Sequence, residues 1–465
     1  MLEDLIIASD RRVAPISVGM IARTREIIDP FVLRDAVIGV LMRHPMARAR
    51  MRRGLSGRRW WFPHTPDDVL TVTKGDSDDD AWEKFADICS HPFDLTTSPP
   101  LRVLHVRLPD GDAVAVAAHH AALDGMSVAM LLWAILERCP TTDPWGGGSE
   151  PTGHATSTAA VGVRTLAPPD RSVLPLLPAR VRPARVRPVR RFVSGLPVPR
   201  MPSRVAPSPG TRSVHAHAEG AHPSQASDDR HSSAYGVYCQ VVPIPKSVRT
   251  LVEDAPATVN DLLLAAAKVA VQRWNTAAGQ ATVTLRVRMP ISRRTPGGTA
   301  AIGNHTGEVL IVTTPRDRRD PATLLAAVRR QTAASKTAGP PPVTGSGIGG
   351  VARLPGPARH ALLRLGVSMA RPLLMPTITV TNLGRLADPS RSGAHGPDIT
   401  SLHFAAFAGL PQGLVIAAAG YRHDLSLTFC YHRDLFDRAA VSRFAQLYRL
   451  ALGELTEFPV VETVG

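Results

Sequence analysis

The chain has little cysteine for its length. Its 465 residues include only Cys89, Cys139, Cys239 and Cys430, which stand far apart and form no CxxC pair. Disulfide-rich secreted domains and thiolate zinc sites both need dense or regularly spaced cysteines. The scarcity therefore argues against both, and we expect four reduced thiols that are buried as small hydrophobic side chains.

The chain also lacks a long unbroken apolar run. No segment reaches the roughly 18–20 apolar residues that a transmembrane helix needs. The nearest approach, residues 404–420, is interrupted by Pro411 and Gln412, so we expect two strands around a turn there. The N-terminus has neither the basic segment nor the apolar segment of a secretory signal. These absences predict a cytoplasmic protein, and peripheral contact with the inner membrane face stays open.

Negative charge is scarce in one region. The whole chain carries a formal charge of +15, and residues 151–235 hold twelve arginines, no lysine and four acidic residues, a net charge of +8. Thirteen of the 42 prolines lie there too, and in the repeat at 178–191 a proline recurs every five residues. Such spacing prevents a stable helix. We therefore expect a partly mobile Pro/Arg-rich linker at 151–235, between domains at 1–150 and 236–465.

Three roles for the Arg/Pro segment at 174–200 stay open. It can be a solvated linker, it can attract anionic phospholipid headgroups, or it can bind nucleic acid without specificity. Its arginines are not interleaved with aromatic residues, and the chain has no signature of a nucleic-acid-binding fold. A membrane surface is therefore favoured over nucleic acid, and no specific nucleic-acid partner is expected.

Apolar periodicity predicts helices and strands in both halves of the chain. Helical periods lie at 31–43, 126–137, 258–274 and 439–455, and the third helix is expected to open at a capping Asn260 or Asp261. Short apolar runs predict strands at 101–106, 113–118, 237–242, 283–289, 307–313, 377–381, 414–418 and 425–431. Interleaved helices and strands predict an α/β fold of two layered domains.

The densest group of chemically active residues is His119-His120-Ala-Ala-Leu-Asp124-Gly125. It lies between the predicted strand at 113–118 and the predicted helix at 126–137. A strand fixes the position of such side chains and a loop exposes them, which is a common arrangement in active sites. Histidine is a natural general base, because a pKa of about 6.5 leaves it mostly neutral at pH 7.

This run resembles the HHxxxDG signature of the condensation-domain superfamily of acyltransferases. Further segments resemble family motifs in the expected order: RHPMARA at 43–49, HPFDL at 91–95, PPLR at 99–102, TVND at 258–261, MPISR at 289–293 with Gly303-Asn304, and TNLG at 381–384. Chain length and several of these motifs look most like wax ester synthase/diacylglycerol acyltransferases and polyketide-associated acyltransferases. The resemblance implies two chloramphenicol-acetyltransferase-like domains with mixed sheets and an interfacial channel.

The resemblance also implies roles for the motif residues. His120 is the general base, and His119 orients the loop. Asp124 either orients the imidazole of His120 or caps the next helix and braces the loop through an arginine. The family resemblance favours the second role. Candidate arginines are Arg286, Arg288 and Arg293, and Gly125 is expected to leave room for substrate.

Three more polar residues are candidates for substrate binding. Asn304 and Asn382 follow predicted strands, where a turn-forming role is equally open, and Ser127 can instead cap the helix. A metal site at the histidine pair is not expected, since no third ligand can be placed. Trp60 and Trp61 can line a lipid surface, but burial is favoured.

The expected reaction transfers an acyl group from acyl-CoA, or an acyl-carrier thioester, to a hydroxyl and forms an ester in lipid or polyketide-lipid metabolism. No bound cofactor is needed because a thioester is already activated, and we expect a monomer. Two alternatives stay open. One is a carrier-protein-dependent condensation enzyme that forms amides, and the other is a noncatalytic member that binds a ligand.

Overall fold

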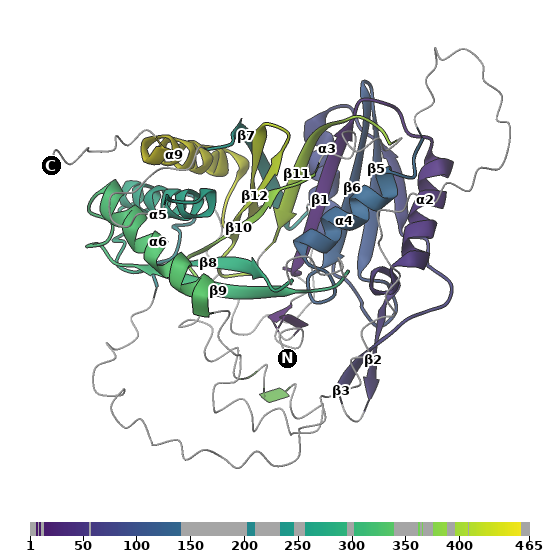
Figure 1. Ribbon diagram of the computed structural model, residues 1–465, viewed down its shortest axis with the longest axis horizontal. Coiled ribbons are helices and arrows are strands. Elements are labelled where there is room, and N and C mark those ends of the chain that lie inside the picture. The colour runs from purple at the N-terminus through teal and green to yellow at the C-terminus, as the bar shows by residue number, and fades with distance from the viewer. Residues whose placement is uncertain are drawn as a thin grey trace.

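A computed structural model gives the structure of the protein, and two sheets with their helices lie side by side in it (Figure 1). The described residues are 6–7, 9–10, 14–54, 57–140, 202–209, 233–245, 256–294, 302–338, 361–362, 365, 375–387, 396–407 and 409–456. All of the Arg/Pro segment at 174–200 and most of the expected linker at 151–235 therefore lie outside the described residues. Residues 202–209 are described, and Val205 and Ala206 pack into the core of the second sheet.

The first sheet has five strands in the order β11-β1-β6-β5-β4. They span Ile399–Ala406 (β11), Ser17–Thr24 (β1), Gly111–His119 (β6), Leu101–Leu108 (β5) and Leu70–Lys74 (β4). Helices α2 (Pro30–Arg43) and α4 (Gly125–Leu136) pack on one face of the sheet, and α3 (Asp78–Ser90) packs on the other. Every residue of β6 is buried, because helices cover both faces of this central strand.

The second sheet has six strands in the order β7-β13-β12-β10-β8-β9. They span Tyr235–Pro243 (β7), Asp424–His432 (β13), Leu414–Tyr421 (β12), Ile378–Arg385 (β10), Leu285–Ser292 (β8) and Thr306–Thr313 (β9). Helices α5 (Val259–Ala277), α6 (Pro321–Ala338) and α9 (Arg438–Thr456) share one hydrophobic core with it. A separate two-stranded hairpin, β2 (Arg50–Gly54) and β3 (Gly57–Trp61), follows the short 3-10 helix η1 (Pro45–Arg48).

Strand β11 joins the two halves of the chain. It comes from the C-terminal half, yet it pairs antiparallel with β1 at the edge of the first sheet, from Val18 opposite Ala406 to Thr24 opposite Ile399. The chain then returns to the second sheet through β12. The edge strand of the first sheet is therefore formed by a segment that begins almost 400 residues along the chain. Local sequence patterns did not predict this pairing.

The predicted mixed α/β architecture of two lobes is confirmed, and each predicted helix and strand is present within a few residues. The reading of residues 404–420 as two strands around a turn is also confirmed, because β11 ends at 406 and β12 begins at 414. The prediction missed β1, β2, β3, β4, α3, α6 and most of β11. No helix among the described residues is long and apolar enough to span a membrane.

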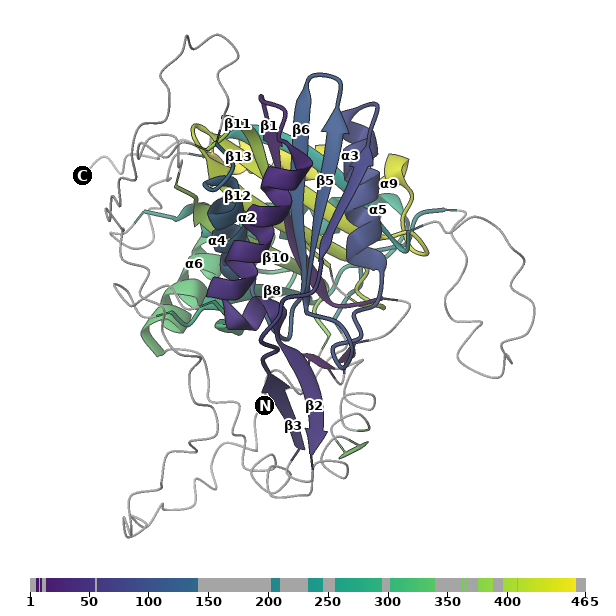
Figure 2. The ribbon, with the colours of Figure 1, turned by 90° about the vertical axis from the view of Figure 1, so that its right-hand side faces the viewer.

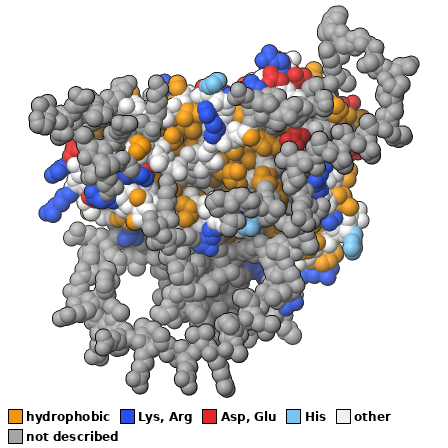
Figure 3. Space-filling model, viewed as in Figure 1, with side chains coloured by type: hydrophobic (Ala, Val, Ile, Leu, Met, Phe, Trp, Pro, Cys, Tyr) orange, Lys and Arg blue, Asp and Glu red, His pale blue; other side chains and the backbone are white. Residues whose placement is uncertain are grey.

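Hydrophobic and basic side chains lie next to each other on the surface. In the space-filling view they occur together at the lower right, where α2 and the hairpin β2–β3 lie (Figure 3). The cysteines behave largely as expected: all four thiols are unbonded to one another, three are buried and Cys239 is half-buried.

The expected cap of α5 is wrong by two or three residues. Thr258 is the N-cap, and it forms a capping box with Asp261: the Thr258 side chain accepts from the Asp261 N–H, and the Asp261 carboxylate accepts from the Thr258 N–H. Asp261 is fully buried and also accepts from the Thr332 hydroxyl at 2.6 Å. The carboxylate therefore holds α5 against α6, in addition to closing the first turn of α5.

Thr258→Ala removes the cap and is expected to lower the free energy of unfolding by about 1 kcal/mol. Urea denaturation followed by circular dichroism measures the change. Thr276→Ala near the exposed end of the same helix is the control, since its hydroxyl bonds only within the helix, to the Gln272 carbonyl. An equal loss in both variants would contradict a capping role.

Candidate active site

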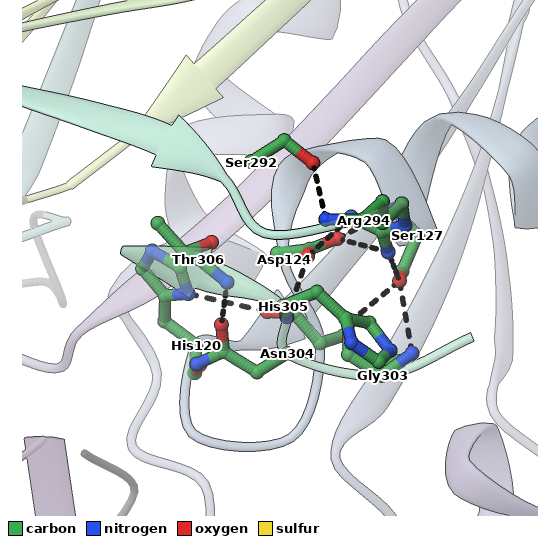
Figure 4. A network of polar contacts seen from close by, with 10 residues as sticks. His120, Asp124, Ser127, Ser292, Arg294, Gly303, Asn304, His305 and Thr306 are labelled. Carbon is green, nitrogen blue, oxygen red and sulfur yellow. Dashed lines mark hydrogen bonds and ion pairs between the residues drawn. The ribbon is translucent and has the colours of Figure 1, made fainter. Parts of the chain in front are cut away.

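The motif occupies the loop between the end of β6 and the start of α4. His119 is the last residue of β6, and Asp124 is the N-cap of α4. Residues 292–294 and 303–306, which end β8 and begin β9, lie against this loop (Figure 4). The candidate site is therefore built at the junction between the two sheets, from segments about 170 residues apart in the sequence.

His120 is held as a neutral base. Its Nδ1 lies 3.2 Å from the Leu123 carbonyl oxygen, which can only accept, so Nδ1 carries the proton and Nε2 carries the lone pair. Within the described parts of the chain, no hydrogen bond is made to Nε2. Burial lowers the pKa of His120, while the nearby charges of Asp124 and Glu308 oppose this shift less strongly. The ring is thus ready to take a proton at Nε2.

His119 faces the other way and is buried. Its Nδ1 accepts from the Ala121 N–H at 3.1 Å, and its Nε2 lies 3.3 Å from Asp10 Oδ2. Asp10 in turn accepts from the Ile16 N–H at 2.9 Å. Both nitrogens of His119 are therefore used in holding the loop to the N-terminal segment. No sequence pattern pointed to Asp10, which is 109 residues from His119.

Asp124 points away from His120 and is the centre of a buried network. Its Oδ1 accepts from the Ser127 N–H at 2.8 Å, which caps α4, and its Oδ2 accepts from the His305 N–H at 2.8 Å. Burial acts to raise the pKa of Asp124, but the hydrogen bonds and charge of Arg294, with these two N–H groups, lower it overall. The carboxylate is therefore ionised and structural, as the family resemblance implied.

The arginine that braces the loop is Arg294, so the choice of Arg286, Arg288 or Arg293 was wrong. Arg294 makes a bidentate pair with Asp124, Nη1 to Oδ2 at 2.6 Å and Nη2 to Oδ1 at 2.9 Å. Arg288 pairs instead with Glu308, at 3.5 Å on the neighbouring strand β9. Arg293 and Arg294 both lie past the end of β8, so the sequence alone could not say which of them meets Asp124.

Ser127 and Asn304 both take part in the network around the loop. The Ser127 hydroxyl is fully buried, donates to the Gly303 carbonyl at 2.7 Å and accepts from Arg294 at 2.8 Å. Asn304 donates to the backbone carbonyl of His120 at 2.6 Å and accepts from the Thr306 N–H at 3.1 Å. The expectation that Ser127 caps the helix is wrong, since Asp124 is the cap, and a contact of Ser127 with substrate stays a prediction.

Asn382 forms a turn at the end of β10. Its Oδ1 accepts from the Gly384 N–H at 2.9 Å, and its Nδ2 donates to the Asn260 side chain at 2.7 Å. Gly384 has a φ of 76°, which a residue with a side chain rarely adopts. The turn-forming alternative thus describes Asn382, as it describes Asn304, and no contact of either with a substrate follows from this geometry.

Gly125 makes room for protein, not for substrate. A Cβ atom at this position would lie 2.7 Å from the Phe404 ring and 2.9 Å from Leu383. Phe404 belongs to β11 and Leu383 to β10, so the glycine lets the C-terminal half approach the start of α4. Gly125 is also not among the described glycines of positive φ, so its backbone conformation does not require a glycine.

No family model matches the chain. Two relatives from Mycobacterium tuberculosis, the uncharacterized protein Rv2305 of strain H37Rv and the uncharacterized protein MT2362 of strain CDC 1551 / Oshkosh, are each 27% identical over 459 residues. Each alignment covers 96% of this chain and 97% of the relative. These relatives therefore match the whole length but name no activity.

Solved structures place the fold. The EpoB cyclization-docking bidomain from Sorangium cellulosum has a TM-score of 0.56 at 15% identity, over 99% of this chain and 84% of that one. A starter condensation domain variant of rhizomide synthetase RzmA gives 0.55 at 12%, over 98% and 93%. The epimerization domain of tyrocidine synthetase B gives 0.52 at 15%, over 96% and 92%. The chain has the fold of a condensation domain.

This likeness agrees with the superfamily suggested by the HHxxxDG motif. The neighbours are condensation, cyclization and epimerization domains of nonribosomal peptide and polyketide synthetases. The finer expectation, closeness to wax ester synthases, stays a prediction. At these identities the fold is shared, and the chemistry has to be argued from the site.

Arg294→Gln is expected to destabilise the protein by about 3 kcal/mol, because it leaves the buried Asp124 carboxylate without its charge partner. Urea denaturation followed by tryptophan fluorescence measures the loss. Arg293→Gln is the matched control, since this neighbouring side chain is exposed. If the two variants lost the same stability, the Asp124–Arg294 pair would not be the brace.

Proposed function

We propose that the protein is an acyltransferase that moves an acyl group from a thioester to a nucleophilic acceptor, with His120 as general base. The observation that supports this most directly is the Nδ1 hydrogen bond to the Leu123 carbonyl, which leaves the Nε2 lone pair unbonded within the described structure. Acyl transfer from a thioester needs a positioned base and no bound cofactor. The condensation-domain fold and the complete motif support the same reaction type.

The proton follows one path through His120. Nε2 takes the proton of the acceptor as its oxygen or nitrogen attacks the thioester carbonyl carbon. When the carbon–sulfur bond breaks, the imidazolium returns that proton to the leaving thiolate. The loop braces are important here, because Asn304 fixes the His120 carbonyl and Asp124 fixes the end of the loop. Holding the base in one geometry lowers the entropic cost of the reaction.

The donor and the acceptor define two forms of this proposal. In the first, acyl-CoA acylates a hydroxyl of a lipid or polyketide and gives an ester. In the second, a carrier-protein thioester acylates an amine and gives an amide, and the likeness to condensation domains favours this form. The rhizomide synthetase domain, solved with C8-CoA and Leu-SNAC, is a neighbour that takes both a CoA derivative and a small thioester.

A matrix of donors and acceptors separates these forms. Purified protein is incubated with acyl-CoA or with the same acyl group on a phosphopantetheinyl carrier protein, and with an alcohol or an amine of equal chain length. Mass spectrometry then identifies the ester or amide. Product from the carrier donor with the amine alone supports the condensation form, and product from acyl-CoA with the alcohol supports the ester form. Failure of all four combinations across chain lengths would favour a noncatalytic role.

His120→Ala is expected to lower kcat/KM for thioester-dependent transfer by about 10²–10⁴-fold, the usual contribution of a general base. Product formation by mass spectrometry measures the loss, and a thermal melt checks that the variant is folded. His423→Ala, an exposed histidine on the turn between β12 and β13, is the control and should retain full activity. Unchanged turnover in His120→Ala would exclude this mechanism.

The value of kcat/KM is expected to fall only at acidic pH. Burial disfavours the imidazolium and lowers the pKa of His120, so the ring stays neutral below the ordinary value of about 6.5. We expect kcat/KM to stay level from neutral pH down past 6.5 and then to drop as His120 is protonated. A pH–rate profile measures this, and an inflection above 6.5 would contradict the assignment of the base.

A further inference from the structure

The hairpin β2–β3 stands out from the body of the molecule. Among the described residues it pairs with no other strand, and it projects beyond α2 and the first sheet (Figure 2). Residues 36–66, which include it, contain seven arginines and no Asp, Glu or Lys. The candidate active site does not explain why this projecting hairpin carries so many arginines.

The two faces of the hairpin differ in character. Arg50, Arg52 and Gly54 lie opposite Trp61, Arg59 and Gly57, and Met51 lies opposite Trp60. Met51 is buried against Phe93 and Leu95, and Trp60 packs on the same cluster, so this face holds the hairpin to the body. Arg52, Arg59 and Trp61 are exposed and make up the outer face.

The outer face keeps positive charge. Arg50 is neutralised by Asp67 at 2.6 Å. The guanidinium of Arg52 instead lies over the Trp61 ring, 3.9 Å from its centroid, and no ion pair of Arg52 or Arg59 occurs among the described residues. An arginine stacked on a tryptophan presents charge and an apolar surface at one place.

The exposed side of α2 continues this surface with apolar side chains and one acidic residue, Asp35. Phe31 is 78% exposed, Met42 is 49% exposed and Ile38 is 40% exposed. Arg48 links Met42 to the segment after β3, because it contacts the Met42 sulfur and donates to the His64 carbonyl at 3.0 Å. Helix and hairpin lie on the same side of the molecule in both ribbon views (Figures 1 and 2).

We propose that the outer face of β2–β3, together with the exposed side of α2, docks on an anionic phospholipid bilayer. Uncompensated arginines attract anionic headgroups, and Trp61, Phe31 and Met42 supply the apolar side chains that enter the boundary between headgroups and acyl chains. Nucleic acid fits less well, because one face of Trp61 is covered by Arg52 and the apolar side of α2 has no counterpart on a phosphate backbone. The proposal does not depend on the acyl-transfer proposal.

The test measures binding of the full chain to vesicles by co-sedimentation. Binding is expected to vesicles of equal parts phosphatidylcholine and phosphatidylglycerol, and to fall sharply with pure phosphatidylcholine or high salt. R52Q/R59Q is expected to weaken binding about 30-fold, since each arginine near an anionic surface contributes about a fivefold factor. W61A is expected to weaken it roughly tenfold through lost apolar contact.

The matched control is R443Q/R449Q, which removes the same charge from exposed positions on α9, at the other end of the molecule (Figure 1). It should bind like the unmodified chain, and thermal melts should show all variants folded. An equal loss of vesicle binding in the control variant would mean that the net charge of the protein, and not the hairpin surface, determines binding. Absence of vesicle binding, unaltered binding in both hairpin variants, or a loss of oligonucleotide binding without a loss of vesicle binding would each overturn the proposal.

Discussion

The ion pair between Asp124 and Arg294 is the contact on which the candidate site depends. Asp124 is almost fully buried, and its two oxygens accept four hydrogen bonds, two of them from Arg294. Removing a charge from water is costly, and an isolated buried carboxylate would be protonated instead. Here the bidentate arginine and two backbone N–H groups offset that cost. The pair fixes the loop after β6 to the segment that joins β8 to β9.

The same junction is closed by contacts of other kinds. Strand β11 extends the first sheet with residues from the C-terminal half, and Phe404 on that strand fills the space that Gly125 leaves. Asn304 bonds the backbone of His120 itself. Residues of both sheets therefore position His120. This explains why its imidazole keeps one orientation although it lies on a loop and its Nε2 makes no hydrogen bond within the described residues.

Much of the fold was accessible from local patterns. Apolar periodicity located helices such as α5 and central strands such as β6, because those elements bury one face or both faces. It missed β1, it missed α3 although that helix buries one apolar face, and it did not reveal that β11 pairs with β1. The motif led to His120 and to the structural role of Asp124. It misassigned Ser127 and Gly125, whose roles depend on Gly303 and Phe404, far away in the sequence.

The sequence by itself determined the type of fold and the residue proposed as the base, because hydrophobic period and a seven-residue motif are local properties. Only the tertiary structure decided which arginine braces Asp124, which aspartate holds His119, and that the charge of β2–β3 lies on an exposed face beside apolar side chains. These are questions of register and of contact between distant segments. Arg293 and Arg294 are adjacent in sequence just past the end of β8, and only the path of the folded chain decides that the side chain of Arg294 meets Asp124 while that of Arg293 is exposed.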